Sequence, residues 1–239
     1  MATKLNILKS SILVVIISVI FAFAPDNNGN QDGCQSYNIN AIDGVFNIYK
    51  YTRDFNFGQA PVEYKQRIGY FLQTRGDTST KFFNGNLSFS NNNLYYTNRL
   101  YMSNDTNDNG SQKWDCLKND NTVLSYHFTR GKAKVKFNNQ NKLQDTITTA
   151  NGLDINLSGV RNADSVIVTI SGFNGSIINK RVTGLTQSIS FTSPELSNFI
   201  SGGIISVSAL NIVPATLNNK NYVFSSVHQY LKLVYFKNN

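Results

Sequence analysis

The chain has 239 residues and a formal net charge of +8, and only 15% of its residues are charged. This length suits one large or two ordinary domains, and scarce Glu with abundant β-branched and aromatic residues argues against a helical protein. The positive charge favours acidic polymers or membrane surfaces as partners, whereas the lack of a recognition helix or binding signature argues against nucleic acid.

An apolar run near the N-terminus predicts export. It extends from Ile12 to Ala24, follows lysines and contains no acidic residue. The run is shorter than the ~20 residues that a spanning helix needs. We therefore expect residues 1–24 to be a signal peptide, or an anchor if uncleaved, followed by a polar linker over 25–42. Pro25 directly follows an Ala-x-Ala pattern, which leaves the cleavage position open.

Cys34 and Cys116 both fall in the part expected to be exported. An oxidising compartment favours a disulfide between them. Two separate thiols are one alternative, and lipidation of Cys34, which Gly33 precedes, is another. Trp114 lies two residues before Cys116 and is expected to be a core anchor beside the bridge.

From residue 43 onward the hydrophobic period is two, and turn-forming residues separate the apolar windows. No window in the first part supports a long helix. We therefore predict a β-sandwich domain over residues 43–144. Its expected strands cover residues 44–52, 67–74, 86–90, 94–102, 113–117, 122–129 and 133–137.

A polar passage over residues 138–152 marks the expected boundary to a second domain, residues 145–239. There Leu153, Ile155 and Leu157 alternate with polar residues, and further short strands follow at spacings near ten residues. These strands read "SVIVTI", "SIINKRV", "SISFT", "GIISVSAL", "NYVF" and "HQYLKLVYF". The predicted fold is all-β, with two β-sandwich domains of immunoglobulin-like or transthyretin-like type after the signal segment.

One short helical turn is expected in "SPELSNF". Ser193 can cap it, Pro194 can occupy the first helical position, and Glu195 lies in the first turn. Such a turn commonly bridges two sheets.

The stretch "DTNDNG" resembles the first half of a calcium-binding loop. It offers oxygen ligands at Asp105, Asn107 and Asn109 before a glycine. The usual bidentate Glu is replaced by Cys116, so the alternative is an ordinary Asn-rich loop tip. No other cofactor is expected.

The stretch "RGKAKVKF" places Lys132, Lys134 and Lys136 on one face of a strand. Together with Arg130 they would contact anionic polysaccharide. Alternatively, these lysines form a solvated face that prevents aggregation of the sheet.

Tyr49 and Tyr51 share a face of the first predicted strand. Exposed rings there would stack on sugars or contact a protein, whereas half-buried sheet positions use Tyr for its β-propensity alone.

Catalytic motifs are not evident. The chain has no nucleophile elbow, metalloprotease helix or phosphate loop, and its carboxylates form no recognisable pair. His127 and His228 lie in expected strands without a nucleophile beside them. We therefore do not expect an enzyme.

The second half, with "GLDINLSGVRNADSVIVTISG", "GGIISVSALNI" and "KNYVF", resembles exported β-sandwich envelope proteins of Bacteroidota. The likeness covers residues 80–237 and implies an envelope or surface component without a known catalytic centre. A fainter likeness links the chain to fimbrillin-type pilus proteins. The resemblance also implies O-glycosylation of Thr146 in "DTI" and Ser165 in "DSV".

The expected function is that of a non-catalytic, exported binding or structural protein of the cell envelope or surface, with adhesion as one such role. Its partner would be an envelope or surface protein or a polysaccharide, and its membrane contact would be limited to an uncleaved N-terminal segment. The alternatives are a carbohydrate-binding module or carbohydrate-active enzyme, and a fimbria-like assembly subunit.

Overall fold

The structure, a computed structural model, describes residues 42–54, 60–72, 80–81, 85–97, 100–104, 112–118, 123–138, 143–184 and 186–238. The predicted signal peptide, nearly all of the predicted linker and Cys34 lie outside these ranges. Within them the chain is nearly all β, which confirms the predicted class at that level. No helix of the described part is long and apolar enough to span a membrane.

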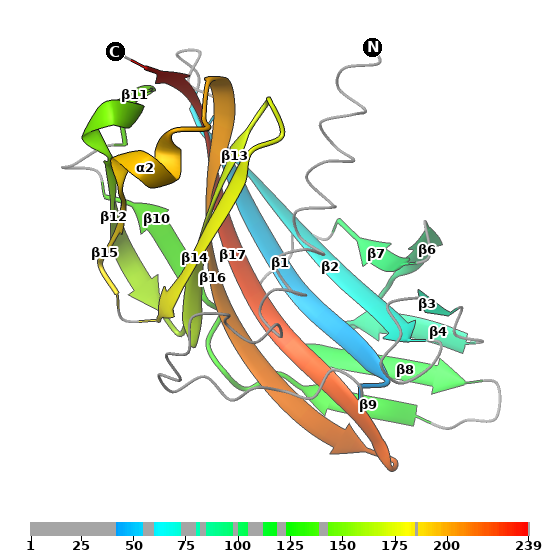
Figure 1. Ribbon diagram of the computed structural model, residues 1–239. Coiled ribbons are helices and arrows are strands. Elements are labelled where there is room, and N and C mark those ends of the chain that lie inside the picture. Colours follow the sequence, from blue (N-terminus) through cyan, green and yellow to red (C-terminus); the bar gives the residue numbers. More distant parts are fainter. Residues whose placement is uncertain are drawn as a thin grey trace.

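One large sheet organises the molecule (Figure 1). Its strands follow the order β14-β13-β16-β17-β1-β2-β7-β6, with β11 paired to β17 and β3 paired to β2. The bounds are β1 Gly44–Asp54, β2 Val62–Leu72, β3 Thr80–Lys81, β6 Tyr95–Thr97, β7 Leu100–Ser103, β11 Thr146–Thr148, β13 Ser165–Gly172, β14 Ile177–Thr183, β16 Ser201–Leu217 and β17 Lys220–Lys237. The first and last of these strands are neighbours, because β1 pairs in parallel with β17.

The hairpin of β16 and β17 is the longest feature of this sheet, with strands of 17 and 18 residues. Asn218 and Asn219 form its turn with φ of 51° and 59°, a conformation that Asn adopts more readily than most residues. The expected break between "NYVF" and "HQYLKLVYF" was wrong, since β17 continues through Ser225 and Ser226. The polar pair is tolerated because Ser225 Oγ donates to Asn47 Oδ1 and Ser226 Oγ accepts the N–H of Ala133 at 3.1 Å.

Two small sheets pack against one face of the large sheet. Their strand orders are β10-β12-β15 and β5-β4-β8-β9. Their bounds are β4 Gly85–Phe89, β5 Asn92–Asn93, β8 Lys113–Lys118, β9 Val123–His127, β10 Lys134–Phe137, β12 Leu153–Arg161 and β15 Ser188–Phe191. Figure 1 shows β10, β12 and β15 on one side of the long hairpin and β4, β8 and β9 on the other.

Each small sheet encloses a core of its own. The aliphatic core lies between β10-β12-β15 and β13, β16 and β17, and it contains Ile155, Val168 and Val207. The aromatic core lies between β4-β8-β9 and β1, β2 and β17, and it is centred on Trp114 and Phe46. Burial of apolar side chains in these cores is the main favourable term for folding.

The large sheet crosses the boundary that the sequence predicted between residues 144 and 145. β1 and β2 belong to the predicted first domain, yet they continue the sheet formed by β13, β14, β16 and β17 of the second. The aromatic core likewise combines Trp114 with Phe224. The division into two domains is therefore not confirmed.

A single helical turn, α2 (Ser193–Leu196), occurs where the sequence predicted one. Its N-cap is Thr192 and not Ser193, one position earlier than expected. The Glu195 carboxylate accepts the Thr192 N–H at 2.7 Å and the Thr192 hydroxyl at 3.0 Å. The backbone hydrogen bond from Thr192 is the main reason that the pKa of Glu195 is lowered. Together with the 3-10 turn η2 (Thr149–Asn151), α2 closes one end of the aliphatic core.

Candidate functional site

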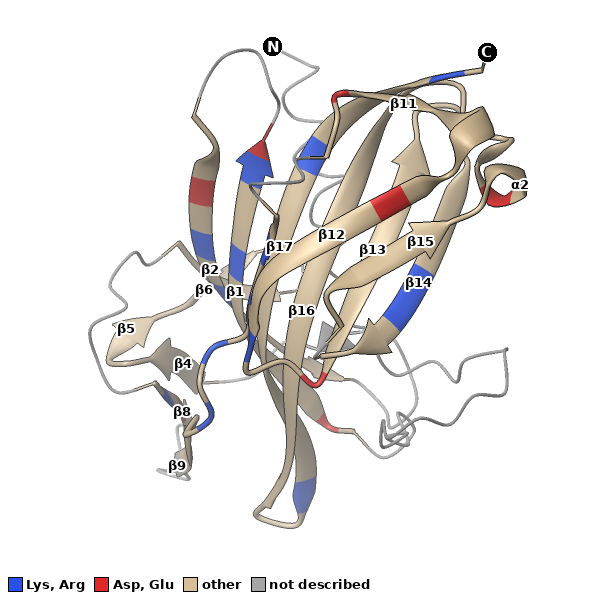
Figure 2. Cartoon of the chain, turned by 90° about the vertical axis from the view of Figure 1, so that its left-hand side faces the viewer, with Lys and Arg blue, Asp and Glu red and all other residues tan. Residues whose placement is uncertain are grey.

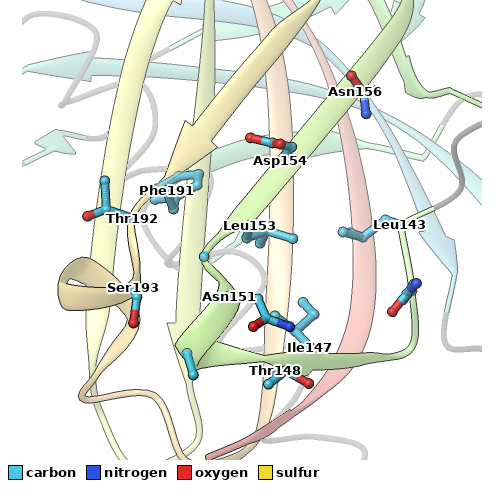
Figure 3. A pocket seen from close by; sticks show the side chains of 13 residues that line it. Leu143, Ile147, Thr148, Asn151, Leu153, Asp154, Asn156, Phe191, Thr192 and Ser193 are labelled. Atoms are coloured by element: carbon cyan, nitrogen blue, oxygen red, sulfur yellow. The ribbon is translucent and has the colours of Figure 1, made fainter.

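A pocket of about 560 Å³ opens at the end of the aliphatic core (Figure 3). Its wall combines β11, η2 and the start of β12 with the junction between β15 and α2. The lining residues are Leu143, Gln144, Ile147, Thr148, Ala150, Asn151, Gly152, Leu153, Asp154, Asn156, Phe191, Thr192 and Ser193. The volume lies within the range of ~300 to 1,000 Å³ that is usual for small-molecule sites.

A tight turn at Gly152 brings the two walls together. Gly152 has φ of 70°, and a Cβ there would lie 2.7 Å from the carbonyl oxygen of Phe191. Only glycine combines this backbone conformation with so close an approach. Just beyond the turn, Leu153 pairs with Phe191 and contributes an apolar surface to the pocket.

Neutral polar groups dominate the remaining lining. Amides come from Gln144, Asn151 and Asn156, and hydroxyls come from threonine and serine. Asp154 is the only ionisable residue among the lining residues, and its Oδ1 accepts a hydrogen bond from Ser190 Oγ at 2.6 Å. Such a lining suits an uncharged ligand with several hydroxyl groups, because amides both donate and accept hydrogen bonds.

The sequence alone does not indicate this pocket. Asp154 and Asn156 are two of the polar residues that alternate with Leu153, Ile155 and Leu157, and this side of a strand is normally the solvated side. What the sequence could not show is that residues of β11 and η2 line the same pocket, because their position depends on the pairing of β11 with β17.

The lysine stripe alternates as predicted. Lys134 and Lys136 of β10 are exposed, while Val135 and Phe137 point into the aliphatic core and Lys132 is half-buried. Their predicted role in binding stays a prediction.

Arg130, which the sequence analysis grouped with these lysines, is engaged elsewhere. Its guanidinium donates to both carboxylate oxygens of Asp164, at 2.7 and 3.1 Å, and Asp164 also accepts the N–H of Ile212 at 2.8 Å. The bidentate pair fixes the chain before β10 to the large sheet.

Tyr49 and Tyr51 are not exposed as a ligand platform would require. Both side chains are buried on the face of the large sheet opposite the two cores. The Tyr49 hydroxyl donates to Gln229 Oε1, and burial raises the pKa of Tyr49 well above its usual value. Tyr51 stacks on Tyr64, with ring centroids 4.8 Å apart, and Arg53 lies 5.0 Å from the centroid of each ring.

Cys116 is a free, buried cysteine whose pKa burial raises to about 12. The structure therefore contains no disulfide at Cys116, and Cys34 lies outside the described residues. Trp114 is fully buried beside Phe46 and Phe89, so the predicted core anchor is confirmed although the predicted bridge is not.

The remaining predicted sites fall into two groups. Asp105, Asn107 and Asn109 of the predicted calcium loop lie outside the described residues, and the described ranges contain no cluster of acidic, His or Cys side chains able to hold a metal ion. Of the two predicted glycan positions, Thr146 is exposed on β11, but Ser165 is fully buried in β13 and leaves no room for a sugar in the folded chain.

His228 is the most strongly perturbed histidine of the described chain. Its Nδ1 accepts the N–H of Val135 at 3.0 Å, which anchors the edge strand β10 to β17. Burial, and then the positive charges of Lys50 and Lys134, lower its pKa to about 4, while Glu63 acts in the opposite direction. The imidazole is therefore neutral at pH 7 and has a structural role.

A scan of the sequence against protein-family models matches none of them, and a search of curated proteins finds no significant match. The functional argument therefore depends on the geometry of the chain itself.

Proposed function

We propose that the protein is a non-catalytic binding module of the cell envelope or cell surface, exported by its N-terminal segment, whose pocket holds a neutral sugar of a polysaccharide or glycoprotein. The observation that carries this proposal is the composition of the pocket lining. Amide and hydroxyl groups surround the half-buried apolar side chain of Leu153. Sugars present the same combination, because their hydroxyl groups lie at the rim of apolar ring faces.

The proposed architecture is a pair of β-sandwiches that share the long hairpin of β16 and β17. In this view β14-β13-β16-β17 and β10-β12-β15 form an immunoglobulin-like sandwich around the aliphatic core. Loops at the ends of such sandwiches are frequent binding sites, because the two sheets hold them rigidly. The pocket lies at one such end, which supports a role in display and binding.

A carbohydrate-active enzyme is less well supported than a binding module. Hydrolysis of a glycosidic bond canonically needs two carboxyl groups on opposite sides of that bond. Asp154 alone supplies a carboxyl group among the lining residues. The pocket therefore favours binding without cleavage.

A fimbria-like subunit is also less well supported. Strand donation needs a terminal strand that can leave its own sheet. β1 is hydrogen-bonded to β17 and β2, and β17 is hydrogen-bonded to β1 and β16. Since β11 also pairs with β17, removing β1 would break two ladders and removing β17 would break three, which favours a stable single unit.

A panel of neutral oligosaccharides, screened by saturation-transfer NMR and titrated by calorimetry, tests the proposal. We expect Asn151→Ala/Asn156→Ala to weaken binding of the selected sugar by about tenfold, because each lost hydrogen bond contributes about 0.5–1.5 kcal/mol. The matched control is Lys134→Ala/Lys136→Ala, which changes exposed residues on β10 and should leave the affinity unchanged. Equal loss in both variants, or no binding by any neutral sugar, would refute the pocket as the site.

A further inference from the structure

A cluster of exposed apolar side chains lies at one end of the large sheet, on the face opposite the two cores. Phe173 is 65% exposed, Ile177 is 64% exposed and Tyr235 is 56% exposed. Ile204 and Leu233 are half-buried beside them. We call these five residues the end patch.

Strand register places the end patch on one continuous surface. Ser171 pairs with both Ile177 and Ile204, and Ile204 pairs with Leu233, so Ile177, Ile204 and Leu233 follow one row across the sheet. Ile205, the neighbour of Ile204, points into the aliphatic core. Because successive side chains alternate, Ile204 and its row face away from that core.

Phe173 and Tyr235 extend the row toward the end of the sheet. Gly202 pairs with Tyr235, and the Phe173 N–H donates to the Gly202 carbonyl at 2.9 Å. A Cβ on Gly202 would lie 2.7 Å from the Phe173 ring, so this ring covers Gly202 on the Ile204 side. Exposed groups of this size and continuity are unusual on a soluble surface and mark an interaction site.

The charges around the end patch are basic or neutralised. The charged residues of β13, β14, β16 and β17 are all Lys or Arg, and these strands contain no Asp or Glu. Figure 2 shows basic residues on β14 and acidic residues on β12 and α2. Two acids outside these strands are paired with their lysines, Asp145 with Lys232 at 3.0 Å and Glu195 with Lys180 at 2.9 Å. The exposed Lys237 follows Tyr235 by two residues, so the surroundings complement an anionic surface.

We propose that the end patch docks on an anionic lipid bilayer. Phe173 lies in the turn between β13 and β14, where its ring can enter the boundary between headgroups and acyl chains. Tyr235 has the amphipathic ring that is enriched at that boundary. Arg181 and the exposed Lys237 alternate onto the same face as Ile177 and Tyr235, and they supply attraction to anionic headgroups.

A second copy of the chain is the main competing occupant. Its simplest route would be pairing along β14, which is an edge strand of the large sheet. Lys180 and Arg181 occupy the middle of β14, and basic residues at this position oppose edge-to-edge pairing. The end patch shares no residue with the lining of the proposed sugar pocket.

Co-sedimentation of the full chain with vesicles tests the proposal. One set of vesicles contains phosphatidylcholine alone, and the other also contains about 30 mol% of the anionic lipid phosphatidylglycerol. We expect Phe173→Ser/Ile177→Ser to weaken binding to the anionic vesicles by at least about tenfold, because two apolar side chains no longer enter the interface. Tyr95→Ser is the matched control, since Tyr95 is 77% exposed on β6, far from β14 in the strand order. The N-terminal apolar run is the same in all chains, so it cannot produce the difference.

Tryptophan fluorescence provides a second measurement, which is needed if Phe173→Ser/Ile177→Ser does not fold. Phe173→Trp adds an exposed tryptophan to a chain whose single Trp is buried. We expect its emission to shift to shorter wavelength on anionic vesicles. Equal binding of Phe173→Ser/Ile177→Ser and the parent chain, or an unshifted Phe173→Trp spectrum, would overturn the proposal. A parent chain that is dimeric without lipid, together with a monomeric Phe173→Ser/Ile177→Ser variant, would also overturn the proposal. A second copy of the chain would then cover the end patch.

Discussion

Trp114→Ala is expected to lower the free energy of unfolding by about 3–5 kcal/mol, the usual range for deleting a fully buried large aromatic side chain. The Trp114 ring lies 5.3 Å from the Phe46 ring and 4.9 Å from the Phe89 ring, measured between centroids. Phe46 in turn stacks on Phe224 of β17 at 5.1 Å. The cavity would therefore weaken the contact between the small sheet β4-β8-β9 and the large sheet. Urea unfolding followed by circular dichroism measures the loss.

Leu117→Ala provides the control on the same strand. Leu117 is exposed on β8, so its truncation should change the unfolding free energy by less than about 0.5 kcal/mol. If Trp114→Ala does not fold, Trp114→Phe replaces it, because Phe retains a smaller ring and its unfolding free energy can still be compared with that of Leu117→Ala. Equal stability of Trp114→Phe and Leu117→Ala would contradict a central position of Trp114 in the aromatic core.

Acidification is expected to destabilise the fold through His228. The folded-state pKa of about 4 lies below the ordinary value of 6.5, so below pH 6.5 the unfolded chain binds a proton that the folded chain does not. Stability is complete above pH 6.5, falls as the pH decreases to 4, and changes no further from this group below 4. The difference corresponds to about 3 kcal/mol. Screening by solvent reduces this little, because the His228 side chain is only 9% exposed.

His228→Asn isolates this contribution, because its side-chain oxygen can still accept the Val135 N–H while the group no longer titrates. Unfolding by urea at pH 7 and at pH 4.5 should show a smaller loss for His228→Asn than for the parent chain. His127 is exposed on β9, so His127→Asn should lose as much unfolding free energy between pH 7 and pH 4.5 as the parent chain. An identical loss in all three chains would show that His228 does not cause the acid sensitivity.

The strand-forming segments were predictable because alternation and turn residues are local signals. Ile155 and Leu157 enter the aliphatic core as their spacing indicates, and Lys134 and Lys136 face outward. The helical turn at Ser193 was located within one residue. Its cap was misassigned because Thr192 and Ser193 can both cap a helix, and only the hydrogen bonds of Glu195 distinguish them.

The pairing of distant strands could not be derived from local patterns. β1 lies beside β17, whose paired residues are 178 positions away in the sequence, and the sequence contains no local signal for this contact. Both faces of β1 are buried, so alternation could not indicate which face Tyr49 and Tyr51 occupy. Strands of both predicted domains therefore share one sheet, and the tyrosines of the predicted platform are buried against it.

The candidate pocket was hidden for the same reason. Asn151, Asp154 and Asn156 belong to η2 and β12, which are close in the sequence. The cavity itself forms only because β11 pairs with β17 and α2 follows β15. The sequence predicted a binding protein from its export signal and strand pattern. It offered Lys132, Lys134 and Lys136 as candidate ligand-binding side chains, with a solvated face as the alternative, whereas Asn151, Asp154 and Asn156 line the pocket in the structure.

Mapping of backbone amide shifts in the presence of the selected neutral sugar tests the proposed pocket most directly. We predict that the largest changes occur at Asn151, Asp154 and Asn156 and at the junction of β15 with α2. Changes centred on Lys134 and Lys136 of β10, or an unchanged spectrum at saturating sugar, would contradict the account.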